Sequence, residues 1–305
     1  MWAITSYYNP HKFKSRRKNF TLFRHHLKCP LIAVEFNPDS NFELKSGIDC
    51  DILIQVKDGS ILWQKERLLN VAISYLPSDE KNVAWIDSDI IFLSNSWIND
   101  AERLLESNNT IQLFSHLIDG KRNEEYPTQS DSQYSGSGLV WKIRNGVSLA
   151  DALYPSSTNE MRTTCFGLAW AANVSFLKSI GLYEMMIIGS GDRAYACAIY
   201  NEFDAACKTL ELNDDRKRHY IAWAKKAHSN CQGKISNIQG AIFHLWHGSI
   251  ENRRYRERHL HFSKFSFDPN INIGYGADGP LKLINCRDNI ELFVKQYLRE
   301  RQDDN

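Results

Sequence analysis

The chain has 305 residues, with 43% hydrophobic residues, 24% charged residues and a net charge of +1 at pH 7. This composition is ordinary for a globular protein, and the near-neutral charge gives no general preference for nucleic acid or membrane surfaces. No apolar run approaches the roughly 18 residues that cross a bilayer, and the N-terminus lacks the pattern of a signal peptide. The seven cysteines are dispersed, which favours reduced thiols. We therefore expect a cytoplasmic protein without a membrane span.

Apolar runs and helical patterns alternate through the first 115 residues. Strands are predicted over 2–8, 30–36, 50–56 and 83–93, and helices over 15–27, 62–77 and 96–107. Such alternation is typical of βαβ units, so the sequence predicts an α/β fold with a mostly parallel, Rossmann-like sheet flanked by helices.

The second half of the chain is less regular. Residues 117–137 are polar and rich in Gly and Ser, and 130–138 are predicted to form a mobile loop. Short strands are predicted over 138–143 and 241–247, and helices over 193–203 and 287–300. No convincing linker divides the chain, so a single domain spanning 1–305 is expected.

Two carboxylates, Asp87 and Asp89, interrupt the most apolar of the predicted strands. On a strand, residues two apart share one face, so both acids would point to one side and Ser88 to the other. Two neighbouring carboxylates repel each other, and a hard divalent cation removes that conflict. One alternative is that one acid caps a turn and the other faces water.

The surroundings of this Asp-Ser-Asp sequence resemble the DxD region of GT-A fold glycosyltransferases. "ITSYYNP" followed by "SRRKNF" resembles their first nucleotide-binding strand and loop, residues 163–196 resemble their acceptor-side segment, and "FHLWHG" (243–248) resembles the segment with their late metal-binding histidine. The second half resembles that of galactosyltransferases. The resemblance covers most of residues 2–260 and implies a nucleotide-sugar half (1–115), an acceptor and catalytic half (116–265) and a C-terminal extension (266–305).

The resemblance implies a Mn²⁺ or Mg²⁺ site formed by Asp87 and Asp89 with one histidine, His244 or His247. Because these histidines are three apart, a strand would place them on opposite faces, so only one is expected to bind the metal. The metal would act as a Lewis acid on a departing diphosphate.

Asp192, in "GSGDRAYA", is the candidate catalytic base. In similar inverting enzymes, an acid before a helix accepts the proton of the acceptor hydroxyl. These enzymes often carry consecutive acids, whereas Arg193 follows here. The alternative is that Asp192 is the N-cap of the following helix.

Further candidates follow from their positions in the resembling segments. Donor-binding candidates are Thr5, Tyr8, Asn9, Arg16, Glu35, Lys65, Arg67 and Ser88. Acceptor-binding candidates are Trp141, Phe166, Gly167, Trp170 and Gly191. A basic cluster, Arg253, Arg254, Arg256 and Arg258, is expected to contact the diphosphate, the acceptor or both. Helical spacing pairs Arg253 with Arg256 and Arg254 with Arg258, one pair for each ligand.

The sequence thus predicts a metal-dependent hexosyl- or pentosyltransferase that uses a nucleoside diphosphate sugar, with a UDP-sugar favoured. The acceptor is left open among a glycan, a small molecule, a protein and a modified nucleobase in nucleic acid, and so is the oligomeric state. The competing functions are a nucleotidyltransferase, which usually has a Gly-rich loop after its first strand, and a non-catalytic sugar- or nucleic-acid-binding protein.

Overall fold

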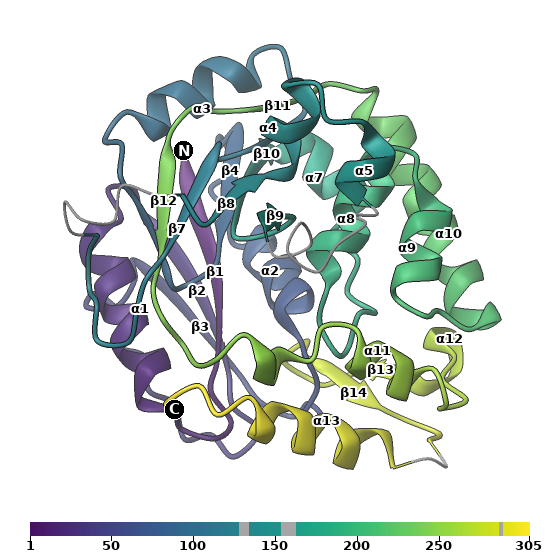
Figure 1. The fold of residues 1–305 in the computed structure, drawn as a ribbon. Helices are drawn as coiled ribbons and strands as arrows, with labels where there is room; N and C mark the ends of the chain where they lie inside the picture. Colours follow the sequence, from purple (N-terminus) through teal and green to yellow (C-terminus); the bar gives the residue numbers. More distant parts are fainter. Residues whose placement is uncertain (128–133, 154–162, 287–288) are drawn as a thin grey trace.

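The computed structural model describes residues 1–127, 134–153, 163–286 and 289–305. Its largest layer is a seven-stranded sheet in the order β11-β6-β10-β4-β1-β2-β3 (Figure 1). Its strands are β1 (Trp2–Tyr8), β2 (Leu31–Phe36), β3 (Ile52–Val56), β4 (Asn82–Ile86), β6 (Thr110–Gln112), β10 (Ala169–Asn173) and β11 (Ile235–Asn237). Only β10 runs antiparallel to its neighbours. The predicted α/β fold with a mostly parallel sheet is confirmed.

A second, five-stranded sheet has the order β5-β12-β7-β8-β9. Its strands are β5 (Ile90–Phe92), β7 (His116–Asp119), β8 (Gly136–Gly138), β9 (Thr164–Cys165) and β12 (Ala241–His244). A hairpin, β13 (Ile273–Tyr275) with β14 (Leu281–Leu283), forms a separate pair. The chain passes from the large sheet to the small one between β4 and β5, which is where the Asp-Ser-Asp sequence lies.

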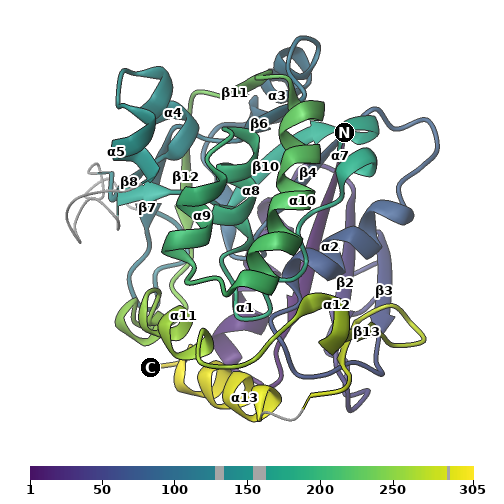
Figure 2. The same ribbon diagram turned by 90° about the vertical axis from the view of Figure 1, so that its right-hand side faces the viewer.

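Helices cover both faces of the large sheet. They are α1 (Lys14–His26), α2 (Lys65–Ser74), α3 (Trp97–Leu105), α4 (Leu139–Arg144), α5 (Leu149–Leu153), α7 (Val174–Ile180), α8 (Gly191–Ile199), α9 (Phe203–Thr209), α10 (Asp214–Cys231), the 3₁₀ turn η1 (Glu251–Arg253), α11 (Glu257–Phe262), α12 (Pro269–Asn272) and α13 (Ile290–Glu300). Figure 2 shows α8, α9 and α10 grouped together, with α13 across one end of the molecule. No helix in the described ranges is long and apolar enough to span a membrane.

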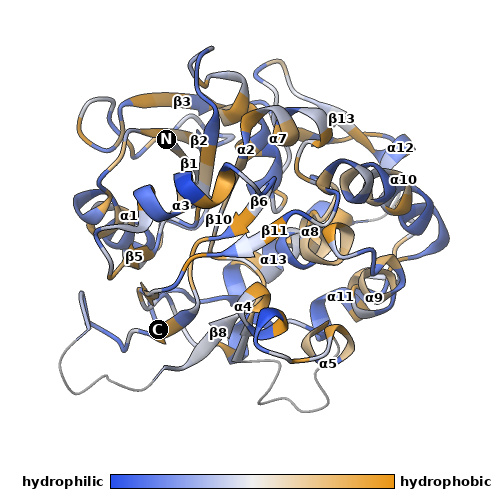
Figure 3. Cartoon of the chain, turned by 90° about the horizontal axis from the view of Figure 1, so that it is seen from above, coloured by the Kyte–Doolittle hydropathy of each residue, from blue (hydrophilic) through white to orange (hydrophobic). Residues whose placement is uncertain are grey.

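The alternation of side chains along the strands explains why the sheet is buried on both faces. In β1, Ala3 packs with Phe20 of α1 and Ala101 of α3, whereas its neighbour Ile4 packs with the core that includes Leu68 of α2. Figure 3 shows apolar residues along the central strands and many polar residues on the surrounding helices. Continuous apolar strands are expected where helices cover both sides of a sheet.

Two predicted elements differ from the structure. Residues 138–143 were expected to form a strand, but β8 ends at Gly138 and α4 begins at Leu139. A short apolar run does not distinguish a strand from a buried helix. The predicted strand over 83–93 is also interrupted: β4 ends at Ile86, residues 87–89 turn, and β5 starts at Ile90 in the other sheet. Of the loop predicted over 130–138, residues 130–133 lie outside the described ranges, and 136–138 form β8.

The C-terminal extension folds back over the N-terminal half. Ser60 N donates to Leu281 O at 2.9 Å, which joins the loop before α2 to β14. The last residues reach the start of α1, where Asp304 accepts hydrogen bonds from the backbone N–H groups of Lys14 and Ser15 at 3.0 and 2.8 Å. Figure 1 shows the C-terminus beside α1. This return of the chain builds one wall of the site described next.

Candidate active site

A cavity of about 200 Å³ lies where β1 and β4 end, between α1, α2, the start of α8 and the segment that follows β12. Its lining includes four acids, Glu66, Asp87, Asp89 and Asp192, and four arginines, Arg16, Arg253, Arg258 and Arg301. Aromatic side chains, among them Tyr8, Phe13 and Trp63, line the part between α1 and α2.

The two acids of the Asp-Ser-Asp sequence face different partners. The expectation that they share one strand face is wrong, because residues 87–89 form the turn between β4 and β5. Asp87 Oδ1 lies 2.5 Å from Lys65 Nζ of α2. Asp89 Oδ2 instead lies 3.4 Å from His247 Nε2, and Ser88 lines the cavity between them.

Asp89, His244 and His247 form the cluster in the described ranges that could hold a metal ion, with ligand atoms within 4.8 Å of one another. His244 Nε2 lies 3.9 Å from Asp89 Oδ1 and 2.8 Å from His247 Nε2. Asp89 Oδ1 is buried and has no hydrogen-bond partner among the described residues. A buried carboxylate oxygen facing two imidazole nitrogens fits a divalent cation, since such an oxygen is otherwise costly to bury.

Both histidines therefore reach the same point, contrary to the expectation that only one of them could. Strand β12 ends at His244, so the alternation of faces does not extend to His247. The chain turns after the strand, and the two rings meet edge to face with centroids 4.8 Å apart. Asp87 is not in this cluster, because Lys65 holds it.

Each histidine contacts a second residue, Asp119 for His244 and Arg253 for His247, whose Nδ1 lies 2.6 Å from Arg253 Nη2. His244 Nδ1 lies 2.9 Å from Asp119 Oδ1, because β12 and β7 are parallel neighbours that place these residues side by side. Burial lowers the pKa of His244, but the hydrogen bond to Asp119 and the charges of Asp89 and Asp119 together outweigh it, so the pKa is raised. Burial and the charge of Arg253 hold the pKa of His247 well below its usual value, which favours the neutral imidazole that binds metals. Carboxylates beside metal-binding histidines typically fix the ring orientation.

Asp192 lies in the first turn of α8 and borders the cavity. The N-cap of α8 is Ser190, which adopts a left-handed conformation with φ 73°, so the alternative of Asp192 as N-cap is wrong. A Cβ atom on Gly167 would lie 2.2 Å from Asp192 Oδ2, so this glycine makes the space for the carboxylate.

Glu66 also lines the cavity, and no pattern in the sequence singles it out. Its side chain is buried at the N-terminal end of α2, and a Cβ on Gly191 would lie 2.2 Å from Glu66 Oε1. Burial raises the pKa of Glu66 to about 7, the charge of Lys65 lowers it, and that of Asp192 raises it further. The predicted acceptor residues Gly167 and Gly191 thus accommodate carboxylates.

The arginine cluster divides differently from the helical prediction. Arg253 and Arg258 are 9% and 5% exposed and line the cavity, whereas Arg254 and Arg256 are exposed. The segment is not one helix: η1 ends at Arg253, Arg254 is left-handed with φ 43°, and α11 starts at Glu257. Arg254 forms an ion pair with Glu300 at 2.7 Å, outside the cavity.

Four of the predicted donor residues are not among the residues that line the cavity. Thr5 Oγ1 donates to Ile86 O at 2.7 Å inside the sheet. Asn9 closes its own loop by accepting from Phe13 N at 2.9 Å. Glu35 accepts from Glu43 N at 2.6 Å on the far side of β2, and Arg67 pairs with Glu184 at 3.3 Å. Tyr8, Arg16, Lys65 and Ser88 do line the cavity.

The three predicted acceptor aromatics do not border this cavity. Trp170 is fully buried, and its Nε1 donates to Phe166 O at 2.8 Å. The Phe166 ring packs under the guanidinium of Arg193 at 3.8 Å. Trp141 lies beside His116, with ring centroids 4.6 Å apart. Trp170 is therefore a core residue, and the sequence reasoning could not distinguish it from a stacking platform.

No family model matches the chain, and no curated protein matches its sequence significantly. The structure is similar to TarS 1–349 of S. aureus, with a TM-score of 0.40 and 13% identity over 98% of this chain and 69% of that one. It is also similar to glucosyl-3-phosphoglycerate synthase of Mycobacterium tuberculosis, solved with Mn²⁺, UDP and phosphoglyceric acid, with a TM-score of 0.41 and 13% identity over 93% and 86% of the two chains. A Drosophila galactosyltransferase 7 mutant, solved with manganese, UDP-Gal and xylobiose, gives a TM-score of 0.39 and 10% identity over 96% and 98%. At TM-scores this low, these likenesses carry no further argument.

Proposed function

We propose that the chain is a GT-A type glycosyltransferase that moves a sugar from a nucleoside diphosphate sugar, preferably a UDP-sugar, to an acceptor hydroxyl. The observation that carries this proposal is one cavity with a candidate metal cluster, a carboxylate at a helix start and a wall of arginines. These groups match the three needs of glycosyl transfer from a diphosphate, which are leaving-group stabilisation, a base and an anion site. The Asp-Ser-Asp sequence supports the same function.

Asp89, His244 and His247 would hold Mn²⁺ or Mg²⁺, which supplies Lewis acidity to the departing diphosphate when bound. Asp119 orients His244 for this role. Lys65 neutralises Asp87 and keeps it from competing for the same cation.

Asp192 is the base of the proposed reaction. Its carboxylate takes the proton from the acceptor hydroxyl, the acceptor oxygen forms a bond to the anomeric carbon, and the bond from that carbon to the diphosphate breaks. The electron pair of the broken bond leaves with the diphosphate, and the anomeric configuration inverts. Arg253 and Arg258 face the cavity where they can receive the growing negative charge.

The first test is a binding panel of nucleoside diphosphate sugars by calorimetry, each with and without Mn²⁺. We expect a UDP-sugar to bind tightest and to need the ion. Binding that is unchanged in EDTA would contradict the metal site, and binding of nucleoside triphosphates alone would favour a nucleotidyltransferase.

The second test replaces the base. Asp192→Asn should lower turnover by roughly 100-fold or more while leaving donor affinity nearly intact, which is the usual scale for a general base. Asp204→Asn, at an exposed acid in the first turn of α9, is the matched control and should turn over normally. A product that keeps the donor's anomeric configuration would contradict the role of Asp192.

A further inference from the structure

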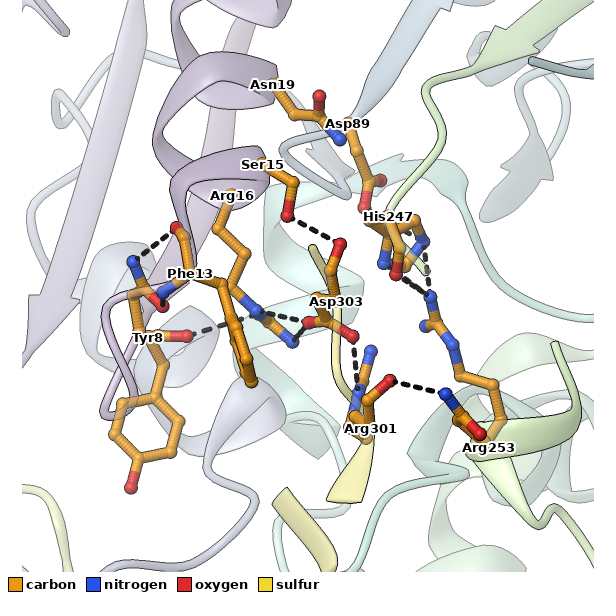
Figure 4. A network of polar contacts seen from close by, with 12 residues as sticks. Tyr8, Phe13, Ser15, Arg16, Asn19, Asp89, His247, Arg253, Arg301 and Asp303 are labelled. Atoms are coloured by element: carbon orange, nitrogen blue, oxygen red, sulfur yellow. Dashed lines mark hydrogen bonds and ion pairs between the residues drawn. The ribbon is translucent and has the colours of Figure 1, made fainter. Parts of the chain in front are cut away.

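Two of the last five residues pack at the cavity: Arg301 lines it, and Asp303 is buried behind it. Asp303 is 0% exposed, and its carboxylate lies between two guanidiniums (Figure 4). Arg16 of α1 places both Nε and Nη2 at 2.6 Å from Asp303 Oδ2. Arg301 Nε lies 3.3 Å from Asp303 Oδ1. Both arginines line the cavity, whereas Asp303 lies behind them.

The tail is fixed independently of these ion pairs. Ser15 Oγ donates to Asp303 O at 2.8 Å, and Asp304 accepts from two N–H groups at the start of α1. Asn252 Nδ2 donates to Arg301 O at 3.3 Å. Gly248 permits the close approach, since a Cβ there would lie 3.0 Å from Asp303 Cα and its φ of +92° suits glycine. Asp303 is thus held at a fixed point by contacts that do not involve its carboxylate.

The charges around Asp303 are not balanced by it. Arg16, Arg301 and Arg253 all act on this one carboxylate. Burial raises the pKa of Asp303, but these three guanidiniums outweigh it, so its pKa is lowered and it is ionised at neutral pH. One carboxylate among three cations leaves positive charge at the cavity surface, where an anion with two phosphates would meet it.

We propose that Asp303 is a positioning residue of the donor site, which holds Arg16 and Arg301 in the orientation that binds the diphosphate. This inference rests on the proposed function. An arginine side chain carries about 2 kcal/mol of rotamer entropy, so a guanidinium held in place before the ligand arrives binds more tightly. Arg16 is the more dependent of the two, because its side chain is 23% exposed and would otherwise move into solvent.

The opposite role is that Asp303 competes with phosphate for the arginines. The two roles predict opposite signs for one substitution. If Asp303 positions the arginines, Asp303→Asn weakens anion binding; if it competes, the same substitution tightens binding. The anchored backbone favours positioning, since a competing carboxylate would need to leave when the ligand arrives.

The experiment measures two constants on the full chain: the dissociation constant of Mn²⁺ alone, by electron paramagnetic resonance, and that of pyrophosphate at saturating Mn²⁺, by calorimetry. We expect Asp303→Asn to weaken pyrophosphate binding by roughly tenfold or more, the scale of one charge-assisted hydrogen bond, and to leave Mn²⁺ binding unchanged. Asp204→Asn is the matched control, because it removes the same charge at an exposed residue in the first turn of α9 that does not line the cavity. It should bind both ligands normally.

A double-mutant cycle tests whether Asp303 acts on pyrophosphate binding through Arg16. In a protein that already carries Arg16→Gln, Asp303→Asn should weaken pyrophosphate binding little further, because the guanidinium that Asp303 positions is already absent. A truncated chain that ends at Arg301 lacks Asp303 altogether, so no asparagine amide is buried among the guanidiniums. It should show the same loss of pyrophosphate binding.

Unchanged or tighter pyrophosphate binding in Asp303→Asn would overturn the inference. A parallel loss of Mn²⁺ binding in Asp303→Asn and in the chain ending at Arg301 would also overturn it. Asp303 would then stabilise the whole site rather than position the arginines. A wild-type protein that binds neither ligand would contradict the proposed function itself, which is a distinguishable result.

Discussion

Lys65 Nζ lies 2.5 Å from Asp87 Oδ1, and this ion pair separates the two acids of the Asp-Ser-Asp turn into different roles. Asp87 is neutralised by a cation from α2, so it stabilises the turn at the end of β4. Among the residues that the structure describes, Asp89 pairs with no lysine or arginine and faces the two histidines. Asp87 is thus engaged in an ion pair within the protein, whereas Asp89 remains available to a ligand.

Removing Lys65 should leave Asp87 without its countercharge in the cavity wall. Lys65 and Asp87 side chains are only 18% and 28% exposed, so we expect Lys65→Gln to lower the free energy of unfolding by about 2 kcal/mol. Lys217→Gln is the control, because its pair with Asp214 spans 3.6 Å between side chains that are 45% and 84% exposed. Urea denaturation should show a change below about 1 kcal/mol for that variant. Equal losses in the two variants would contradict a special role for the buried pair.

The metal cluster makes a graded prediction. Asp89→Asn should abolish measurable Mn²⁺ binding, because it removes the anionic ligand. Asp119→Asn should weaken binding by about 10- to 100-fold, since it only loosens the orientation of His244. Asp214→Asn, at an exposed acid far from the cluster in sequence, should bind normally. Titration of Mn²⁺ followed by paramagnetic resonance distinguishes the three, and an Asp89→Asn protein with wild-type affinity would exclude this site.

Gly167 offers a test of the base that leaves every charge in place. In Gly167→Ala the new methyl group would lie 2.2 Å from Asp192 Oδ2, so the carboxylate must move away from its position. We expect a loss of turnover of about 100-fold, comparable to loss of the base, with Mn²⁺ binding unchanged. Gly274→Ala is the control, since its nearest neighbour would be Ile284 at an ordinary 3.4 Å. Full activity of Gly167→Ala would show that the position of Asp192 does not matter.

Glu66 makes stability depend on pH. Its pKa is raised from 4.5 to about 7 by burial, so the folded protein holds this proton more tightly than the unfolded chain does. The resulting stabilisation is fully present below pH 4.5 and is lost as the pH rises to about 7. Between these values, the free energy of unfolding of the wild type should fall relative to Glu66→Gln by up to about 3 kcal/mol. Urea denaturation at pH 5 and pH 8 measures this, with the exposed Glu106→Gln as control; parallel curves for wild type and Glu66→Gln would contradict it.

The arginines give a comparison within one segment. Replacing the buried pair Arg253 and Arg258 by Ala should weaken pyrophosphate binding by about 100-fold, because each loses charge-assisted hydrogen bonds. Replacing the exposed pair Arg254 and Arg256 should change it less than about threefold at 0.15 M salt, where exposed charges are screened. Similar losses of pyrophosphate binding in both double variants would mean that the four arginines act only through their overall positive charge.

The first half of the fold follows from local sequence, whereas the site depends on contacts between distant segments. Apolar runs identified β1, β2 and β4, and the helical spacing identified α1. The run at 138–143 failed because its six residues suit either a strand or a helix. Nothing local indicates that Asp119 meets His244, since that contact comes from the pairing of β7 with β12.

The C-terminal residues show the same limit more sharply. "RQDDN" is polar and has no periodicity, so it resembles a solvated end of the chain. In the structure, Arg301 and Asp303 are 2% and 0% exposed; Arg301 lines the cavity, and Asp303 lies behind it. Burial of a charged tail depends on partners elsewhere, here Arg16 in α1. Asp87 and Asp89 could be identified from the sequence because they interrupt an apolar run. Asp303 could not, because all of its neighbours in the sequence are also polar.

The turn between β4 and β5 carries one last consequence. Asp87 follows a strand of the large sheet, and Asp89 precedes a three-residue strand of the small sheet, which pairs Ile90 with His244. A slip of that short pairing by one residue would reverse which way each side chain of β5 points and would carry Asp89 away from the histidines. Inserting a single residue between Ile90 and Phe92 should therefore disrupt the metal cluster while the seven-stranded sheet remains intact. The position of Asp89 relative to the two histidines therefore depends on the register of a strand of only three residues.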